Sequence, residues 1–72
     1  MKIGNRLRDL REKNNITQAQ IAEKLGITQG AVSQWEVGAT NPSIGTISKL
    51  SEILNCTVDE LLGITKTPTQ NG

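Results

Sequence analysis

Apolar residues recur along the chain at intervals of three and four positions, with polar residues between them. This spacing follows the helical period of about 3.6 residues and predicts amphipathic helices rather than strands. Five segments carry the pattern, at about residues 3–13, 17–25, 29–36, 44–54 and 57–62. The residues expected to face a common core are Ile3, Leu7, Leu10, Ile21, Ala22, Leu25, Ile27, Ala31, Val32, Trp35, Ile44, Ile47, Leu50, Ile53, Leu54, Val58, Leu61 and Leu62.

Residues that begin and end helices stand at the boundaries of these segments. Thr17 with Gln20, and Thr57 with Glu60, have the spacing of a capping box at a helix N-terminus. Because the pattern and the boundary signals agree, we expect an all-α fold: a compact five-helix bundle of residues 1–63. Residues 64–72, rich in Thr, Pro, Asn and Gly, are expected to form a flexible tail or the start of a linker. The other boundary residues are Asn14, Asn15, Gly26, Thr28, Gly38, Ser43, Asn55 and Gly63.

The composition excludes several classes of function. The chain has 72 residues, one cysteine (Cys56) and no histidine, which excludes a disulfide framework and a zinc site of Cys/His type. Without histidine there is no nucleophile–base arrangement, so we expect neither an enzyme nor a bound cofactor or metal. No apolar run approaches the roughly 20 residues of a membrane span, and Met1 to Gly4 lead directly into charged residues. We therefore expect a cytoplasmic protein without a signal peptide or a membrane partner.

The charge is nearly balanced overall but unevenly distributed. The net charge is +1, with six Lys or Arg against three Asp or Glu in residues 1–24, and one against four in residues 25–62. A mildly basic first third is compatible with nucleic-acid binding, although it lacks the strong basic bias usual in such domains. Ordinary solvated helix faces explain the same distribution equally well.

Residues 17–36 carry the most informative pattern of the chain. Two short helical segments are joined by a tight turn at Gly26, the arrangement of a DNA-binding helix-turn-helix. If Val32 and Trp35 face inward, the outer face of the second of these helices holds Gln29, Gly30, Ser33 and Gln34. A glutamine can form two hydrogen bonds with adenine in the major groove. Gly30 would let the backbone approach a base closely, or it is simply tolerated near a helix start.

Residues 3–63 resemble the DNA-binding domain of the lambdoid phage repressors and Cro proteins, within the wider Xre family. The resemblance covers about 60 of the 72 residues, in order. It implies a lambda-repressor-like fold in which the second and third helices form the helix-turn-helix. The motif residues are Gln18, Ala19, Ile21, Ala22, Leu25, Gly26, Ile27 and Gln29, then Val32, Ser33, Trp35, Glu36 and Gly38, and finally Pro42 and Ser43.

The resemblance also implies roles for single residues. Gln29 and Gln34 correspond to base-reading positions, while Gly30 replaces a polar side chain that relatives often carry, so that one base contact is expected to be missing. Gln18 corresponds to a residue that binds a phosphate and can brace Gln29. Helix N-termini in general bind phosphates, because their first N–H groups are free to donate and the helix dipole is positive there. The complete set expected to contact phosphates is Thr17, Gln18, Thr28, Thr40, Asn41 and Ser43.

Arg11 and Glu36 match a family pair that forms a partly buried salt bridge between the first and third helices. Such a bridge would make Arg11 structural rather than a DNA contact; the alternative is two independent surface charges. Trp35 lies on the apolar stripe with Val32 and is expected in the core rather than stacked on a base.

We predict a sequence-specific regulator of transcription, most simply a repressor, that binds double-stranded DNA as a homodimer, at least on DNA, at an inverted repeat. The dimer contact is expected at Asn55, Val58, Leu62 and Ile64. Operator binding would associate the protein with the nucleoid. Two alternatives remain open at this point: a protein-interaction module such as an antitoxin-like domain, or the N-terminal fragment of a longer repressor.

Overall fold

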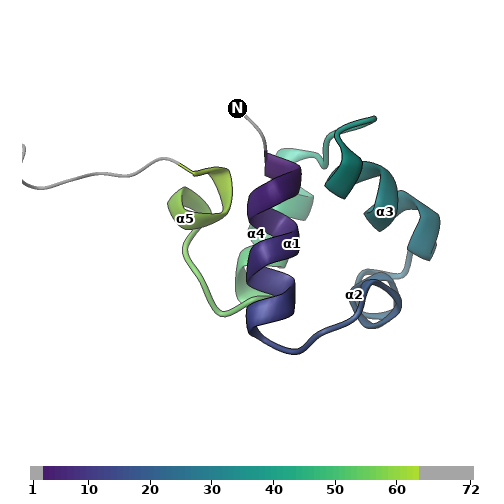
Figure 1. The fold of residues 1–72 in the computed structure, drawn as a ribbon, viewed down its shortest axis with the longest axis horizontal. Coiled ribbons are helices and arrows are strands. Elements are labelled where there is room, and N and C mark those ends of the chain that lie inside the picture. Colours follow the sequence, from purple (N-terminus) through teal and green to yellow (C-terminus); the bar gives the residue numbers. More distant parts are fainter. Residues whose placement is uncertain (1–2, 64–72) are drawn as a thin grey trace, which may run out of the picture.

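The structure, a computed structural model, describes residues 3–63, and within them it contains five helices and no strand. The all-α prediction is confirmed. Figure 1 shows α1 across the centre of the bundle, with α5 on one side, α2 and α3 on the other, and α4 behind. The helices are α1 (Ile3–Lys13), α2 (Gln18–Leu25), α3 (Gln29–Val37), α4 (Ile44–Ile53) and α5 (Val58–Leu62).

Local hydrogen bonds explain where the helices begin. The Thr17 hydroxyl accepts from the Gln20 N–H at 3.1 Å, while the Gln20 side-chain oxygen accepts from the Thr17 N–H at 2.9 Å. Thr57 and Glu60 form the same reciprocal box before α5, at 3.0 and 2.8 Å. Both capping boxes expected from the sequence are therefore present, and each satisfies N–H groups that a helix start leaves without partners.

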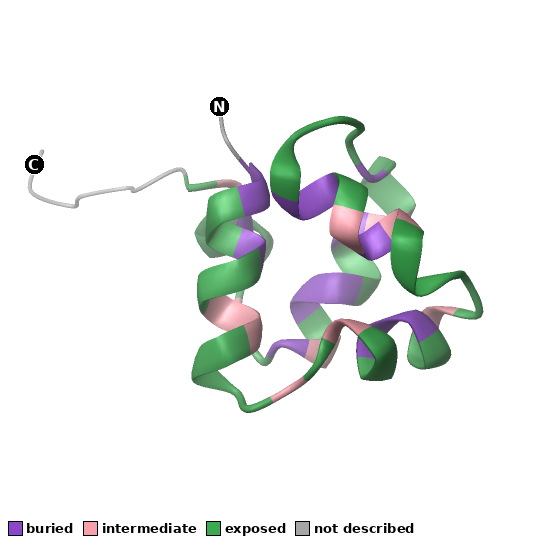
Figure 2. Ribbon diagram, turned by 45° about the vertical axis from the view of Figure 1, so that its right-hand side comes forward, coloured by how far each residue is buried: buried purple, intermediate pink, exposed green. Residues whose placement is uncertain are grey.

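The core lies between the helices, on the inner side of α1. Its fully buried members come from all five helices and from the residue that ends α4, so no helix is peripheral to the packing. Figure 2 shows the buried segments of the helices toward the centre of the bundle and exposed segments around them. The buried apolar residues are Ile3, Leu7, Ile21, Ala22, Val32, Trp35, Ile47, Leu50, Leu54 and Leu61.

Three residues expected in the core are exposed instead. Ile27 is 38% exposed, Ile44 79% and Val58 36%. Ile27 lies in the turn between α2 and α3, while Ile44 and Val58 are each the first residue of a helix. Helical periodicity assigns such residues to a face but does not tell how far the neighbouring helices extend along it. The prediction was therefore wrong at the edges of the bundle and right at its centre.

No helix among residues 3–63 is long and apolar enough to cross a membrane. The expected tail of residues 64–72 lies outside the described residues.

Cys56 is half-buried, and burial together with the nearby charge of Glu60 raises the pKa of its thiol. A raised pKa leaves less thiolate at a given pH, and the thiolate is the reactive form. We therefore expect iodoacetamide at pH 8 to alkylate the folded protein severalfold more slowly than the urea-unfolded chain. Mass spectrometry of the modified fraction over time measures this, and equal rates in the two states would contradict it.

Candidate nucleic-acid interface

The α2–turn–α3 unit is built around a small buried residue and a left-handed turn. Ala22 is buried on α2, which packs directly against α3. Gly26 has a φ of +72°, a conformation that glycine adopts without strain. The N–H of Ile27 then donates to the Ala22 carbonyl at 3.0 Å, which closes the end of α2. The turn directs the chain into α3, whose first turn is exposed.

The outer face of α3 carries the residues expected to read bases. Gln29, Gly30 and Gln34 are exposed, and Ser33 is half-buried. Among the described residues, a Cβ atom added at Gly30 would have only the Thr28 hydroxyl oxygen within 4 Å, at 3.9 Å. The fold therefore does not require a glycine at this position, because the space that a Cβ atom of residue 30 would occupy is free.

A buried ion pair fixes the end of α3 against α1. Arg11 Nε lies 2.6 Å from Glu36 Oε2, and Arg11 Nη2 donates to Glu36 Oε1 at 3.2 Å. The two side chains are only 13% and 4% exposed. Arg11 Nη1 also donates to the Ile16 carbonyl at 3.0 Å. The expected pair is present, and its hydrogen bonds raise the pKa of the Arg11 guanidinium.

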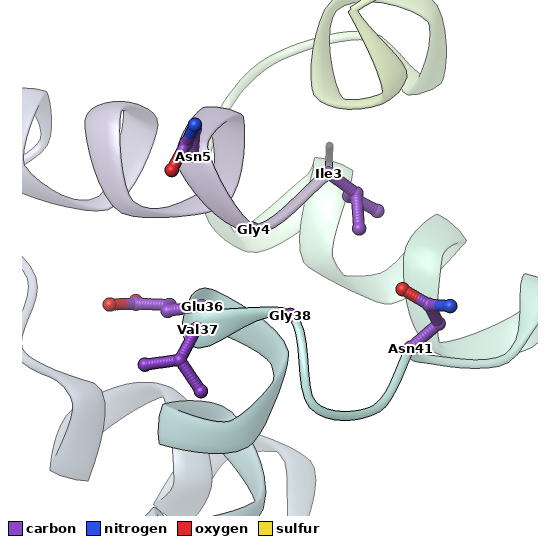
Figure 3. A pocket seen from close by; sticks show the side chains of 7 residues that line it. All are labelled: Ile3, Gly4, Asn5, Glu36, Val37, Gly38 and Asn41. Atoms are coloured by element: carbon purple, nitrogen blue, oxygen red, sulfur yellow. The ribbon is translucent and has the colours of Figure 1, made fainter. Parts of the chain in front are cut away.

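A second contact between α1 and α3 is made by backbone. A Cβ atom at Gly4 would lie 2.5 Å from the carbonyl oxygens of both Trp35 and Glu36. Figure 3 shows Gly4 facing the turn that ends α3, with Asn5 pointing away from it. Among the described residues that line the surrounding pocket, Glu36 is the one charged side chain, and it is already paired. Sequence reasoning missed Gly4, although a glycine in the first turn of an otherwise good helix is a signal for close approach.

Gln18 connects the ion pair to the outer face. Its Nε2 donates to Glu36 Oε1 at 2.9 Å, and its Oε1 accepts from Gln29 Nε2 at 3.4 Å. The bracing contact between Gln18 and Gln29 that the resemblance implies is therefore present in the structure.

The residues expected to bind phosphate lie at three helix N-termini and in one loop. Thr17, Thr28 and Ser43 are the N-caps of α2, α3 and α4, and each hydroxyl oxygen accepts a backbone N–H of its own helix. Ser43 also bonds the Thr46 hydroxyl at 3.0 Å. Thr40 and Asn41 are exposed in the loop before α4, and Gln18 is half-buried.

The residues expected at a dimer contact are at the other end of the bundle, around α5. Asn55 is exposed with a φ of +55°, Val58 is partly exposed and Leu62 is packed against the edge of the core. Ile64 lies outside the described residues.

Comparison with known proteins shows the family to which the chain belongs. The sequence model of the helix-turn-helix family matches residues 7–61, and the chain belongs to that family. It is similar to the transcriptional activator BcrR of Enterococcus faecalis, with 36% identity over 99% of this chain and 37% of BcrR. The chain spans half or less of the first curated relatives that it matches.

Two solved structures share the fold. The P22 c2 repressor in complex with a synthetic operator superimposes with a TM-score of 0.80 and 35% identity, over 90% of this chain and 98% of that one. The biofilm regulator SinR in complex with DNA gives a TM-score of 0.75 and 34% identity, over 83% of this chain and 97% of that one. The predicted lambda-repressor-like fold is thereby confirmed.

Proposed function

We propose that this chain binds double-stranded DNA sequence-specifically as the recognition domain of a transcriptional regulator, and that it acts as a repressor. The observation that carries the proposal is the exposed Gln29–Gln34 face of α3. On the inner side of this helix, the buried Arg11–Glu36 ion pair joins it to α1. The structural similarity to the P22 c2 repressor bound to an operator supports it. In this proposal the outer face of α3 enters the major groove, and Gln29 favours adenine there.

In the same proposal, the protein acts as a homodimer on an inverted repeat whose half-sites are about one helical turn apart. A single domain of this size contacts too little DNA for high specificity. The exposed Val58 and the partly buried Leu62 offer apolar surface on α5 for the second subunit, and Asn55, shortly before this helix, is exposed. Sedimentation of the protein with and without DNA tests this step, since a one-to-one complex on a palindromic site would contradict it.

We expect a weak dependence of affinity on salt. The phosphate-binding set is uncharged, and we expect only two or three cationic contacts per subunit, from the basic first third of the chain. Each neutralised phosphate contributes about −0.9 to the slope of log K against log salt, which gives about −2 to −3 per subunit. Fluorescence anisotropy at several salt concentrations measures the slope. A much steeper value would show that more cations than these contact the DNA.

Anisotropy titrations against operator and scrambled DNA test the proposed function directly. The double variant Gln29→Ala with Gln34→Ala is expected to lose the preference for the operator while keeping weak non-specific binding. Asn5→Ala is the matched control, because it removes an exposed amide on α1 that points away from α3. Unchanged sequence preference in the double variant would exclude the proposed reading face.

A protein-interaction module of the antitoxin type is the second candidate. It is favoured by the net charge of +1 and by the absence of Lys and Arg from residues 25–48, which include the whole of α3. The same titrations separate the two functions. A wild-type chain without any preference among DNA sequences would favour the interaction module.

A further inference from the structure

The carboxylate of Glu36 is buried and does not lie on the outer face of α3. At the inner side of α3, its Oε1 accepts from both Arg11 Nη2 at 3.2 Å and Gln18 Nε2 at 2.9 Å. An ionised carboxylate accepts hydrogen bonds and donates none. The Gln18 amide must therefore turn its nitrogen toward Glu36, because its oxygen in that place would face a negative charge.

The orientation of Gln18 decides that of Gln29. With its nitrogen toward Glu36, Gln18 turns its oxygen toward Gln29, and only an N–H of Gln29 can complete the contact, as it does at 3.4 Å. An amide has nearly the same shape in its two flipped states but opposite hydrogen-bonding ends. The charge of Glu36 thus determines which end of the Gln18 amide, and then of the Gln29 amide, faces its neighbour.

We propose that Glu36 is a positioning residue for base recognition: through Gln18, it sets which end of the Gln29 amide faces the DNA. The inference rests on the proposed function. Held by Gln18 through one N–H, Gln29 presents its oxygen and its second N–H. This donor–acceptor pair matches N6 and N7 of adenine. In the flipped state Gln29 would present its NH₂ end, which suits O6 and N7 of guanine, both acceptors.

Glu36→Gln tests the proposal, because the new amide can offer Gln18 either a donor or an acceptor. DNA selected from a random pool by the wild type, compared with the pool selected by Gln29→Ala, first identifies the base pair that Gln29 reads. Affinities for adenine and guanine at that position are then measured. The wild type should prefer adenine by about 5- to 150-fold, the range of one bidentate contact. In Glu36→Gln this ratio should fall toward one.

Two controls separate positioning from other effects of the substitution. Glu23→Gln removes a negative charge from the exposed side of α2, and it should strengthen binding to both DNAs alike without changing their ratio. Arg11→Lys weakens the bidentate ion pair but keeps the Glu36 carboxylate for Gln18. It should lower the melting temperature and leave the adenine preference intact.

Gln18→Met provides the same test without touching the ion pair, in case Glu36→Gln does not fold. It should abolish the adenine preference as well, whatever its effect on phosphate binding. A folded Glu36→Gln or Gln18→Met protein with the wild-type ratio would overturn the proposal. So would an Arg11→Lys protein that loses the ratio to the same extent, because the effect would then follow the stability of α3. A wild type without any base preference would instead refute the proposed function itself.

Discussion

Replacing Arg11 with methionine is expected to lower the free energy of unfolding by about 3–5 kcal/mol, the usual cost of removing one partner of a buried ion pair. The reason is that Glu36, 4% exposed, would remain buried with Gln18 as its only other side-chain donor among residues 3–63. Urea denaturation followed by the fluorescence of Trp35 measures the change, since this is the only tryptophan in the chain and it is buried.

Two further variants test whether the loss of stability comes from the buried ion pair. Arg8→Met removes a cation from an exposed position of the same helix and should change stability by no more than about 0.5 kcal/mol. The double variant Arg11→Met with Glu36→Leu removes both charges and should recover most of the loss, because an apolar pair needs no desolvation of ions. If Arg11→Met were as stable as Arg8→Met, the ion pair would contribute nothing to the folded state.

Gly4→Ala is expected to destabilise the domain by about 1–3 kcal/mol, the range typical of overpacking. In an unobstructed helix the same change would stabilise, because alanine is the better helix former by about 1 kcal/mol. Here the added methyl group would lie 2.5 Å from two carbonyl oxygens of α3, which are backbone atoms and cannot turn aside. The melting temperature should therefore fall by about 4–8 °C for each kcal/mol lost.

Gly45→Ala is the matched control for this prediction. Gly45 also lies in the first turn of a helix, but no described residue lies within 4 Å of an added Cβ there. This substitution should raise stability by about 0.5–1 kcal/mol. Thermal melts of the two variants, compared with the wild type, should thus shift in opposite directions. A rise in the melting temperature of both variants would show that α1 and α3 are not in close contact at Gly4.

The fold could be predicted from local signals because its elements are short and each has its own boundaries. Thr17 with Gln20 and Thr57 with Glu60 form the expected capping boxes, and Gly26 and Gly38 end their helices in the left-handed conformation. Such signals act over three or four residues, so a sequence displays them directly. The positions of Ile44 and Val58 depend on where other helices end, which local patterns do not contain.

The local sequence pattern predicts the outer face of α3, but it does not predict the contacts that connect this face to α1 and α2. The outward face of α3 follows from the inward positions of Val32 and Trp35, while the pairing of Arg11 with Glu36 came from the family resemblance. The hydrogen bond from Gln18 to Glu36 joins residues 18 positions apart on two helices, and no local pattern indicates it. The approach of Gly4 to α3 is equally a property of the packed bundle.

Selection of bound DNA from a random pool tests the central claim most directly. The wild-type protein should enrich an inverted repeat with adenine at the base pair that each Gln29 reads. The variant with Gln29→Ala and Gln34→Ala, folded as judged by the fluorescence of Trp35, should enrich no such repeat. If the wild type and this variant selected the same sequences, or if neither selected any, the account of α3 as the DNA-reading helix would be wrong.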